Sequence, residues 1–371
     1  MADPGQIISN VTTFDRYIVR RLLLGFATLV VLLILFFIAL HYVEYMDDFY
    51  DRGASMREVF LVYYPSYVPE IVKLTSPLAL FLASVFITAK LAQQLELAAL
   101  MTSGVSIFRL FIPYALVGVM VTGGVWWFNG WVVPKTNQVR VDYEYRYFKD
   151  DRTRLKTSNL HLQNSPSTIL VTEYFDRRTD TAHEVSLQIF EGSNRIRERI
   201  DAREMRWIDS VGVWRLQDVT RRTFQSDGRE HREFSVELDT VLNVLPRDLR
   251  RRERDVEFLT ISEAKSFLDA LERSGVGGTG RPLVEYYSKF AYPFANLILI
   301  LISLPLAAVR RQGGQAVQLG LGLGIAFVYL ALQKLSEPFG YAGDLSPAVA
   351  SWLPHAVFAL IGCVLLARVR T

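Results

Sequence analysis

The residues of this chain of 371 that could catalyse a reaction are not arranged in any common catalytic motif. No Walker A pattern, zinc-spaced His and Glu pair, Gly-x-Ser-x-Gly elbow or Cys-x-x-Cys pair occurs in the sequence. The histidines show no ligand spacing, and surface or interfacial roles are the ordinary interpretation of them: His41, His161, His183, His231 and His355. We therefore expect no catalytic residue, no metal site and no cofactor bound by this chain, so that a partner supplies any covalent chemistry.

One segment has the composition of a docking element for another protein. Residues 90–106 read KLAQQLELAALMTSGVS, with high helix propensity as far as Gly104 and a single acid at Glu96. A short helix of this kind, lying along a membrane surface, fits a groove of a partner protein. An ordinary solvated loop helix has the same spacing, so the residues alone leave both interpretations open.

Long uncharged stretches determine where that segment lies. About 18 to 20 apolar residues carry a helix across the hydrocarbon layer, and five stretches reach that length. A further stretch, Leu74–Ala89, is short, and extending it back to Val59 includes Glu70, Lys73 and two prolines, which predicts a kinked span. The six expected spans are Leu22–Leu40, Val59–Ala89, Leu110–Val133, Phe290–Val309, Gln312–Gln333 and Leu345–Ala367.

Basic residues give these spans an orientation, because short loops rich in Lys and Arg stay preferentially in the cytoplasm. They precede the first span, flank the loop after the second, follow the fourth and end the chain, and six spans place all of them on one side. The opposite loops, residues 41–58 and 336–344, are rich in acids. Both termini are expected in the cytoplasm, and the first span, which lacks a cleavage site, is expected to remain in the mature protein.

The polar block between the third and fourth spans predicts an all-β domain on the outer side. Apolar and polar residues alternate in short runs such as Thr168–Thr172, Glu184–Phe190 and Phe234–Leu238. Hairpin turns are expected at Ile208–Trp214 and Ser226–Gly228. We infer an antiparallel sandwich or a jelly-roll-like sheet.

Domain boundaries follow from these patterns. An amphipathic helix is expected from Leu259 to Ser274, with Thr260 or Ser262 as its N-cap and Gly275 as its stop. The expected parts are a membrane half at 1–134, the β domain at 135–258, a connecting helix and linker at 259–282, and a second membrane half at 283–371.

Charge and cysteine content exclude two further possibilities. Acids nearly balance the Lys and Arg of residues 135–254, and the net charge of the chain is only +3, so we expect no nucleic-acid partner. Cys363 is the single cysteine, so no disulfide forms within the chain.

The segment around Glu96 resembles the coupling segment of the LptF/LptG (YjgP/YjgQ) family of lipopolysaccharide-export permeases. The pattern is Glu-Leu, Ala-Leu and Gly-x-Ser in register, at Glu96, Leu97, Ala99, Leu100, Gly104 and Ser106. The resemblance covers the whole chain, including the three-plus-three layout, and the acidic stretch Val43–Phe49 is more similar to the LptG branch. Further matching residues are Asp15-Arg16-Tyr17, Val132-Val133-Pro134, Trp214-x-Leu216, Pro293 through Pro305 and Trp352-Leu353-Pro354.

The resemblance implies a transport mechanism in the bacterial inner membrane. Members of the family pair with the paralogous permease as an LptF–LptG heterodimer and bind a dimer of the ATPase LptB, which binds ATP and Mg. The pair takes lipopolysaccharide from the outer leaflet of the inner membrane and passes it to a periplasmic bridge of the LptA type. A bitopic LptC subunit joins the complex, and the jelly-roll domains line up to carry the acyl chains.

The resemblance also implies roles for individual residues. Glu96, Leu97, Ala99, Leu100 and Gly104 would face the ATPase. Lys73, Lys135 and Arg140 are candidates to contact lipid A phosphates, although Lys73 has the spacing of an ion pair with Glu70 and Lys135 and Arg140 fit a solvated flank equally well. The acidic stretch after the first span departs from the basic residues that the family carries there. Candidates for the acyl-chain cavity or its gate are Phe36, Phe37, Gly320 and Gly324, for which lipid contact or plain helix packing is the alternative.

Two other classes of protein stay open at this stage. One is the permease of another ABC-type envelope lipid or lipoprotein exporter, which shares the coupling segment but differs in span count and domain position. The other is a membrane-anchored β-domain scaffold without transport activity, for which six spans with glycine-rich helices are more than an anchor needs.

Overall fold

The computed structural model describes residues 13–51, 53–147, 160–176, 179–191, 195–209, 211–224, 229–249, 255–274, 279–308 and 314–368. The chain divides into two compact units. The membrane unit comprises Met1–Val141, Glu257–Ile261 and Leu283–Thr371, and the β unit comprises Asp142–Val256 and Ser262–Pro282. The two ends of the chain therefore build one unit, and its middle builds the other.

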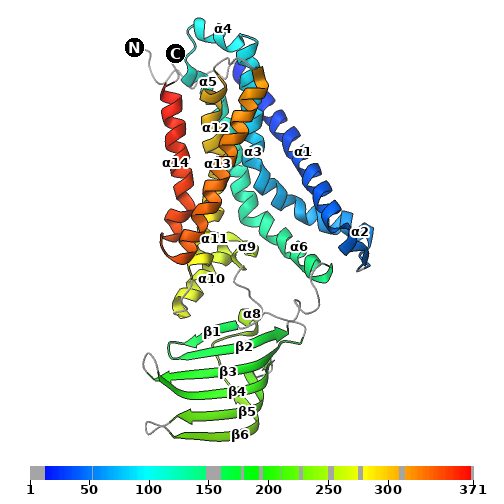
Figure 1. Ribbon diagram of the computed structural model, residues 1–371, viewed down its shortest axis with the longest axis vertical. Helices are drawn as coiled ribbons and strands as arrows, with labels where there is room; N and C mark the ends of the chain where they lie inside the picture. Colours follow the sequence, from blue (N-terminus) through cyan, green and yellow to red (C-terminus); the bar gives the residue numbers. More distant parts are fainter. Residues whose placement is uncertain are drawn as a thin grey trace. The chain divides into compact units, whose positions relative to one another are not determined.

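Long apolar helices make up the N-terminal part of the chain. A π-helical turn precedes α3 and another joins α5 to α6, so each of these spans is longer than its uncharged core. Pro69 and Pro77 lie inside α3, and the helix changes direction along its length in Figure 1. The elements are α1 (Thr13–Asp51), α2 (Met56–Glu58), η2 (Val59–Tyr63), α3 (Tyr64–Gln93), α4 (Glu96–Thr102), α5 (Ile107–Trp127), η3 (Phe128–Val132) and α6 (Val133–Tyr147).

The C-terminal part contains a broken span followed by two continuous ones. Its helices are α11 (Gly280–Ala291), α12 (Phe294–Ala307), α13 (Gly314–Ala342) and α14 (Pro347–Arg368). Helices α11 and α12 meet at an angle of 50°, where Pro293 interrupts the helical hydrogen bonding. Among the described residues, five helices are long and apolar enough to cross a membrane, and the bent pair brings the number to six.

The prediction of three spans, a β domain and three more spans is thereby confirmed. The first residues of α1 and the last of α14 lie at the same end of the membrane unit as α4, as an even number of spans requires (Figure 1). The expected ends of the fourth and fifth spans at Val309 and Gln312, with the basic pair Arg310 and Arg311, lie outside the described residues.

Helices α3 and α12 form the centre of the membrane unit. One apolar cluster packs α3 and α12 against α1 and α5, through residues such as Leu22, Leu80 and Tyr114. A second packs them against α13 and α14, through Phe81 and Tyr329. Helix α1 is peripheral by contrast, because 6% of its most apolar window is buried within the chain, against 67% for the span that contains α3. So large an apolar surface on α1 requires lipid or another protein as its neighbour.

The β unit contains an antiparallel sheet in which each strand pairs with the next along the chain. The described strands are β1 (Leu160–Ser165), β2 (Thr168–Asp176), β3 (Thr181–Glu191), β4 (Arg195–Ile208), β5 (Val213–Phe224) and β6 (Glu230–Thr240). The expected all-β, antiparallel character is confirmed. The described strands form one meander in which each pairs with the next along the chain, whereas a sandwich would divide them between two sheets.

Turns and short helices complete the β unit. The hairpin expected at Ile208–Trp214 joins β4 to β5, with the amide of Gly212 donating to the Ile208 carbonyl at 2.9 Å. The turn expected at Ser226–Gly228 and the helix stop at Gly275 lie outside the described residues. Helices α8 (Pro246–Leu249) and α9 (Asp255–Phe258) follow the sheet, and the expected amphipathic helix is α10 (Ile261–Ser274).

Trp214 lies at the centre of the β unit core. Its side chain is fully buried among apolar residues of β2 to β5, and its indole N–H donates to the Val244 carbonyl at 2.7 Å. This bond holds the segment after β6 against the sheet. The neighbouring Trp207 is half-buried, with its ring edge-to-face on Trp214, and its indole N–H donates to the Asp209 carboxylate at 2.7 Å in an exposed bond.

Trp214→Phe should destabilise the β unit by about 2–4 kcal/mol, because it leaves a buried carbonyl without a donor and opens a void. Hydrogen exchange of the full-length protein, read by mass spectrometry, should become faster in β4 and β5. Trp207→Phe removes an exposed bond of the same length and should change exchange little. Equal effects of the two substitutions would contradict the assigned role of Trp214.

Candidate functional site

Helix α4 is a separate short helix, set off from α3 by a break in the backbone. The sequence predicted a short helix from Lys90 to Gly104 after a span that ends at Ala89. In the structure α3 continues to Gln93, Leu95 adopts the left-handed conformation with φ of 62°, and the short helix begins at Glu96. Tertiary contact overrides helix propensity here, because the break turns Leu97 into the apolar core, where it is 3% exposed. The predicted stop at Gly104 is confirmed, with φ of +90°, a conformation that glycine adopts at low cost.

The outer face of α4 is exposed and combines one acid with apolar side chains. Glu96 and Ala99 are exposed, as are the large apolar side chains of Leu95 and Phe108 on either side of the helix. Leu100 is half-buried and packs on the core. We call Leu95, Glu96, Ala99 and Phe108 the α4 surface. An apolar patch with a single charge at its centre is suited to a protein groove.

An ion pair ties together the two spans that flank this surface. The Arg109 guanidinium, three residues into α5, donates to both carboxylate oxygens of Asp15 in α1, at 2.8 and 2.6 Å. Ser106 caps α5 by accepting a hydrogen bond from the Arg109 amide at 3.3 Å. Sequence reasoning used Asp15 and Arg109 separately and missed their contact, which no spacing rule indicates across 94 residues.

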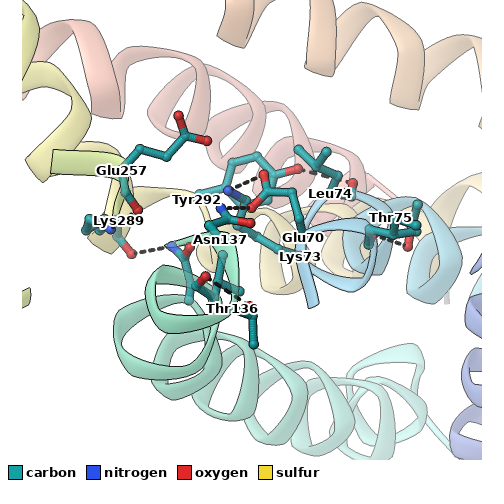
Figure 2. Close-up of polar contacts among 12 residues, drawn as sticks. Glu70, Lys73, Leu74, Thr75, Thr136, Asn137, Glu257, Lys289 and Tyr292 are labelled. Atoms are coloured by element: carbon teal, nitrogen blue, oxygen red, sulfur yellow. Dashed lines mark hydrogen bonds and ion pairs between the residues drawn. The ribbon is translucent and has the colours of Figure 1, made fainter. Parts of the chain in front are cut away.

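A second group of polar side chains is buried where α3, α6 and α11 meet (Figure 2). In α3, Glu70 pairs with Lys73 at 2.5 Å, as the spacing predicted. The other carboxylate oxygen of Glu70 accepts from the Asn137 amide of α6 at 2.8 Å. We call Glu70, Lys73 and Asn137 the Glu70 cluster. It joins the second span to the third.

The broken span is fixed beside this cluster. The Asn129 amide donates to the Lys289 carbonyl at 3.1 Å, and the Tyr292 hydroxyl donates to the Leu74 carbonyl at 3.1 Å (Figure 2). Lys289 is 7% exposed, and its ammonium donates to the Glu257 carbonyl at 3.4 Å. Sequence reasoning missed Lys289 and Asn137, because α6 and α11 carry many polar residues and nothing in their sequences marks these two as buried.

The segment Glu257–Ile261 belongs to the membrane unit, although in sequence it lies between two segments of the β unit. The Gln138 amide of α6 donates to the Phe258 carbonyl at 2.8 Å. The Ile261 side chain lies against Gly130, so closely that a Cβ at this glycine would be 2.7 Å from its Cδ1 atom. These contacts fix a second point of the chain, after α6, on the same membrane unit.

The other predicted cations have different surroundings. Arg140 in α6 lies over the ring of Tyr67, with 5.1 Å from its guanidinium carbon to the ring centroid, and its charge acts on Glu70. Lys135 is exposed. The structure thus gathers Lys73 and Arg140 around one carboxylate and leaves Lys135 on the surface.

The predicted cavity residues lie on exposed helix faces. Phe36 and Phe37 of α1 are 59% and 36% exposed and form an edge-to-face pair with centroids 5.6 Å apart. Gly320 and Gly324 of α13 have no neighbour where a Cβ would be, and they line an apolar groove of about 470 Å³ between α13 and α14. The close helix approach on α13 lies instead at Gly340, where a Cβ would be 2.7 Å from the Ala350 Cβ of α14, while Gly322 faces Val85 of α3 at an ordinary contact distance.

Comparison with known proteins decides what kind of membrane protein carries these features. The family model described as "Lipopolysaccharide export system permease LptF/LptG" matches residues 16–368. The chain belongs to the LptF/LptG family. It is 21% identical over 364 residues to the lipopolysaccharide export system permease protein LptG of Escherichia coli strain K12, which covers 95% of this chain and 98% of that protein. The LptG of E. coli O6:H1 strain CFT073 gives the same values.

Membership of the LptF/LptG family makes this chain a multi-pass inner-membrane permease of lipopolysaccharide export. The resemblance inferred from the residues around Glu96 is confirmed at the level of the family. Both relatives carry the name LptG, in agreement with the branch that Val43–Phe49 indicated.

Asp15→Asn should lower the melting temperature of the detergent-solubilised protein by a few degrees, because it leaves the Arg109 guanidinium without its carboxylate. Arg109→Lys keeps the charge but loses the two-pronged contact, so its effect should be smaller. Asp344→Asn, in the exposed loop before α14, is the control and should have no effect. A melting temperature of Asp15→Asn equal to that of the control would show that the pair contributes nothing.

Proposed function

We propose that this chain is the permease subunit of an ATP-driven exporter that extracts lipopolysaccharide from the outer leaflet of the inner membrane and passes it to a periplasmic bridge. ATP and Mg bind to a separate ATPase dimer of the LptB type. The paralogous permease completes a heterodimer, and an LptC-type bitopic subunit and an LptA-type bridge receive the substrate. The observation that carries this proposal is the α4 surface, in a chain that matches the family from end to end.

The α4 surface has the features needed for coupling to the ATPase. Glu96, Leu97, Ala99 and Leu100 lie on α4, and Gly104 follows its end. Leu97 anchors the helix in the core, and Glu96 is exposed. The bond between Asp15 and Arg109 connects the adjoining ends of α1 and α5. A movement of the ATPase against α4 would therefore move the first three spans together. The ends of α1 and α14 on the α4 side are cytoplasmic in this proposal, and the β unit is periplasmic.

Substrate binding uses the opposite halves of the spans. Lys73, Lys135 and Arg140 are the cations proposed to contact lipid A phosphates, since ammonium and guanidinium groups are the usual partners of phosphate oxygens. The exposed apolar faces that carry Phe36, Phe37, Gly320 and Gly324 are proposed to line the acyl-chain cavity or its gate in the heterodimer. Their exposure in the single chain agrees with a neighbour of lipid or protein at both faces.

The β unit offers a path for acyl chains. Strand β6 is last in the sheet order, and Phe234 and Val236 on one of its faces are 79% and 78% exposed. They lie on the same face as Leu238, which packs on the apolar core. An apolar face that continues past the end of the core is suited to acyl chains or to the sheet of the next protein in the bridge.

Glu96→Lys should uncouple ATP hydrolysis from transport, because it reverses the one charge of the α4 surface while leaving the buried anchor Leu97 in place. In vesicles reconstituted with the whole complex, lipopolysaccharide release per ATP hydrolysed should fall at least tenfold, with ATP hydrolysis retained or altered independently. Release should be measured together with hydrolysis in the same vesicles.

Asp344→Lys is the matched control, since it reverses an exposed acid in the loop between α13 and α14, far from α4 in the chain. It should leave the ratio of release to hydrolysis unchanged. Normal release by Glu96→Lys, in a complex that assembles normally, would rule out Glu96 as the coupling acid.

A further inference from the structure

Both carboxylate oxygens of Glu70 are held by donors from two helices. Lys73 binds one oxygen at 2.5 Å and the Asn137 amide binds the other at 2.8 Å (Figure 2). The side chains of Glu70 and Lys73 are 8% and 14% exposed. Ammonium and amide N–H groups bind carboxylate and phosphate oxygens in the same way. Glu70 therefore occupies donors that a phosphate group would also use.

Further charges act on the same carboxylate. Arg140 of α6 and Lys289 of α11 both attract Glu70, in addition to Lys73. Lys289 also faces the like charge of Lys73, which repels it, and the opposite charges of Glu257 and Glu285. Glu70 is thus the carboxylate whose charge acts on Lys73, Arg140 and Lys289 together. Glu70 is therefore an anion surrounded by the basic side chains of Lys73, Arg140 and Lys289.

Stability alone gives little reason for this arrangement. A buried ion pair contributes little net free energy, because the desolvation of two charges offsets their attraction, and an apolar pair of similar size stabilises as well or better. Ionisable side chains inside a membrane are costly and mark pathways for polar groups. The Glu70 carboxylate is costly to bury, and it has the same sign of charge and the same donors as a lipid A phosphate. We therefore expect its role to be in substrate binding.

We propose that Glu70 is a resident anion of the phosphate site, which occupies Lys73 and Asn137 when the site is empty and competes with the substrate phosphate for them. The inference rests on the proposed function, in which Lys73 and Arg140 contact lipid A phosphates. Competition weakens binding of the phosphate and speeds its release, because the donors return to Glu70 as the substrate leaves. Glu70 then sets affinity without touching the substrate.

The test compares phosphorylated and dephosphorylated lipid A binding to the complete complex in nanodiscs. Glu70→Gln keeps an oxygen for Asn137 and removes the charge. It should tighten the binding of bisphosphorylated lipid A about tenfold, or 1.4 kcal/mol, and leave the affinity for dephosphorylated lipid A unchanged. Glu337→Gln is the control, since Glu337 forms an ion pair with Lys334 of the same spacing on α13, at 3.0 Å, and it should change neither affinity.

A double substitution separates competition from a structural role. Because Glu70 acts through Lys73, the gain should disappear in the Glu70→Gln/Lys73→Gln complex relative to Lys73→Gln alone. Unchanged or weaker binding of phosphorylated lipid A by Glu70→Gln, or an equal gain for both lipids, would overturn the inference. Should Glu70→Gln fail to assemble, Glu70→Asp withdraws the carboxylate by one methylene and should give a smaller gain, and no gain would overturn the inference.

Binding to the wild-type complex distinguishes failure of the proposed function from failure of the role of Glu70. If that complex binds neither form of lipid A, the proposed function fails and the inference fails with it. If it binds phosphorylated lipid A but gains nothing from Glu70→Gln, only the role of Glu70 is overturned.

Discussion

A charge buried among membrane-spanning helices is costly unless it is paired, since an unpaired one costs several kcal/mol. Much of the membrane unit depends on this constraint. Glu70 of α3 pairs with Asn137 of α6, Asp15 of α1 pairs with Arg109 of α5, and Lys289 of α11 binds the Glu257 carbonyl. Each pair joins segments that are far apart in sequence. Pairing therefore fixes which helices lie together, and apolar packing around α3 and α12 fills the remaining space.

The apolar surfaces that the single chain leaves exposed indicate which partners it needs. Helix α1 is almost entirely peripheral, α4 presents one acid among apolar side chains, and the face of β6 continues beyond its core. They differ in chemistry: a purely apolar helix face, an apolar surface with one acid, and an apolar sheet face. A subunit that joins a partner permease, an ATPase and a bridge needs these three kinds of surface, and this agreement supports the proposed assembly.

Much of this fold could be predicted from the sequence, because long apolar runs and period-two alternation are local signals. The spans, the hairpin before Trp214 and helix α10 were found in this way. The break at Leu95 could not be predicted, since it depends on where Leu97 packs, nor could the meander order of the sheet. Of the sites, the pair of Glu70 with Lys73 follows from helix spacing. The contacts of Asp15 with Arg109 and of Asn137 with Glu70 depend on the packing of distant helices.

Affinity purification of this chain from its native membrane in mild detergent, with mass spectrometry of the proteins and lipids that accompany it, tests the central claim most directly. The account predicts recovery of a soluble ATPase, a second permease with the same layout of spans, and lipid A species. Recovery of the chain alone, or with an envelope protein but no ATPase, would contradict it. In that case, the α4 surface would have no ATPase to bind, and a scaffold role would explain the spans and the β unit better.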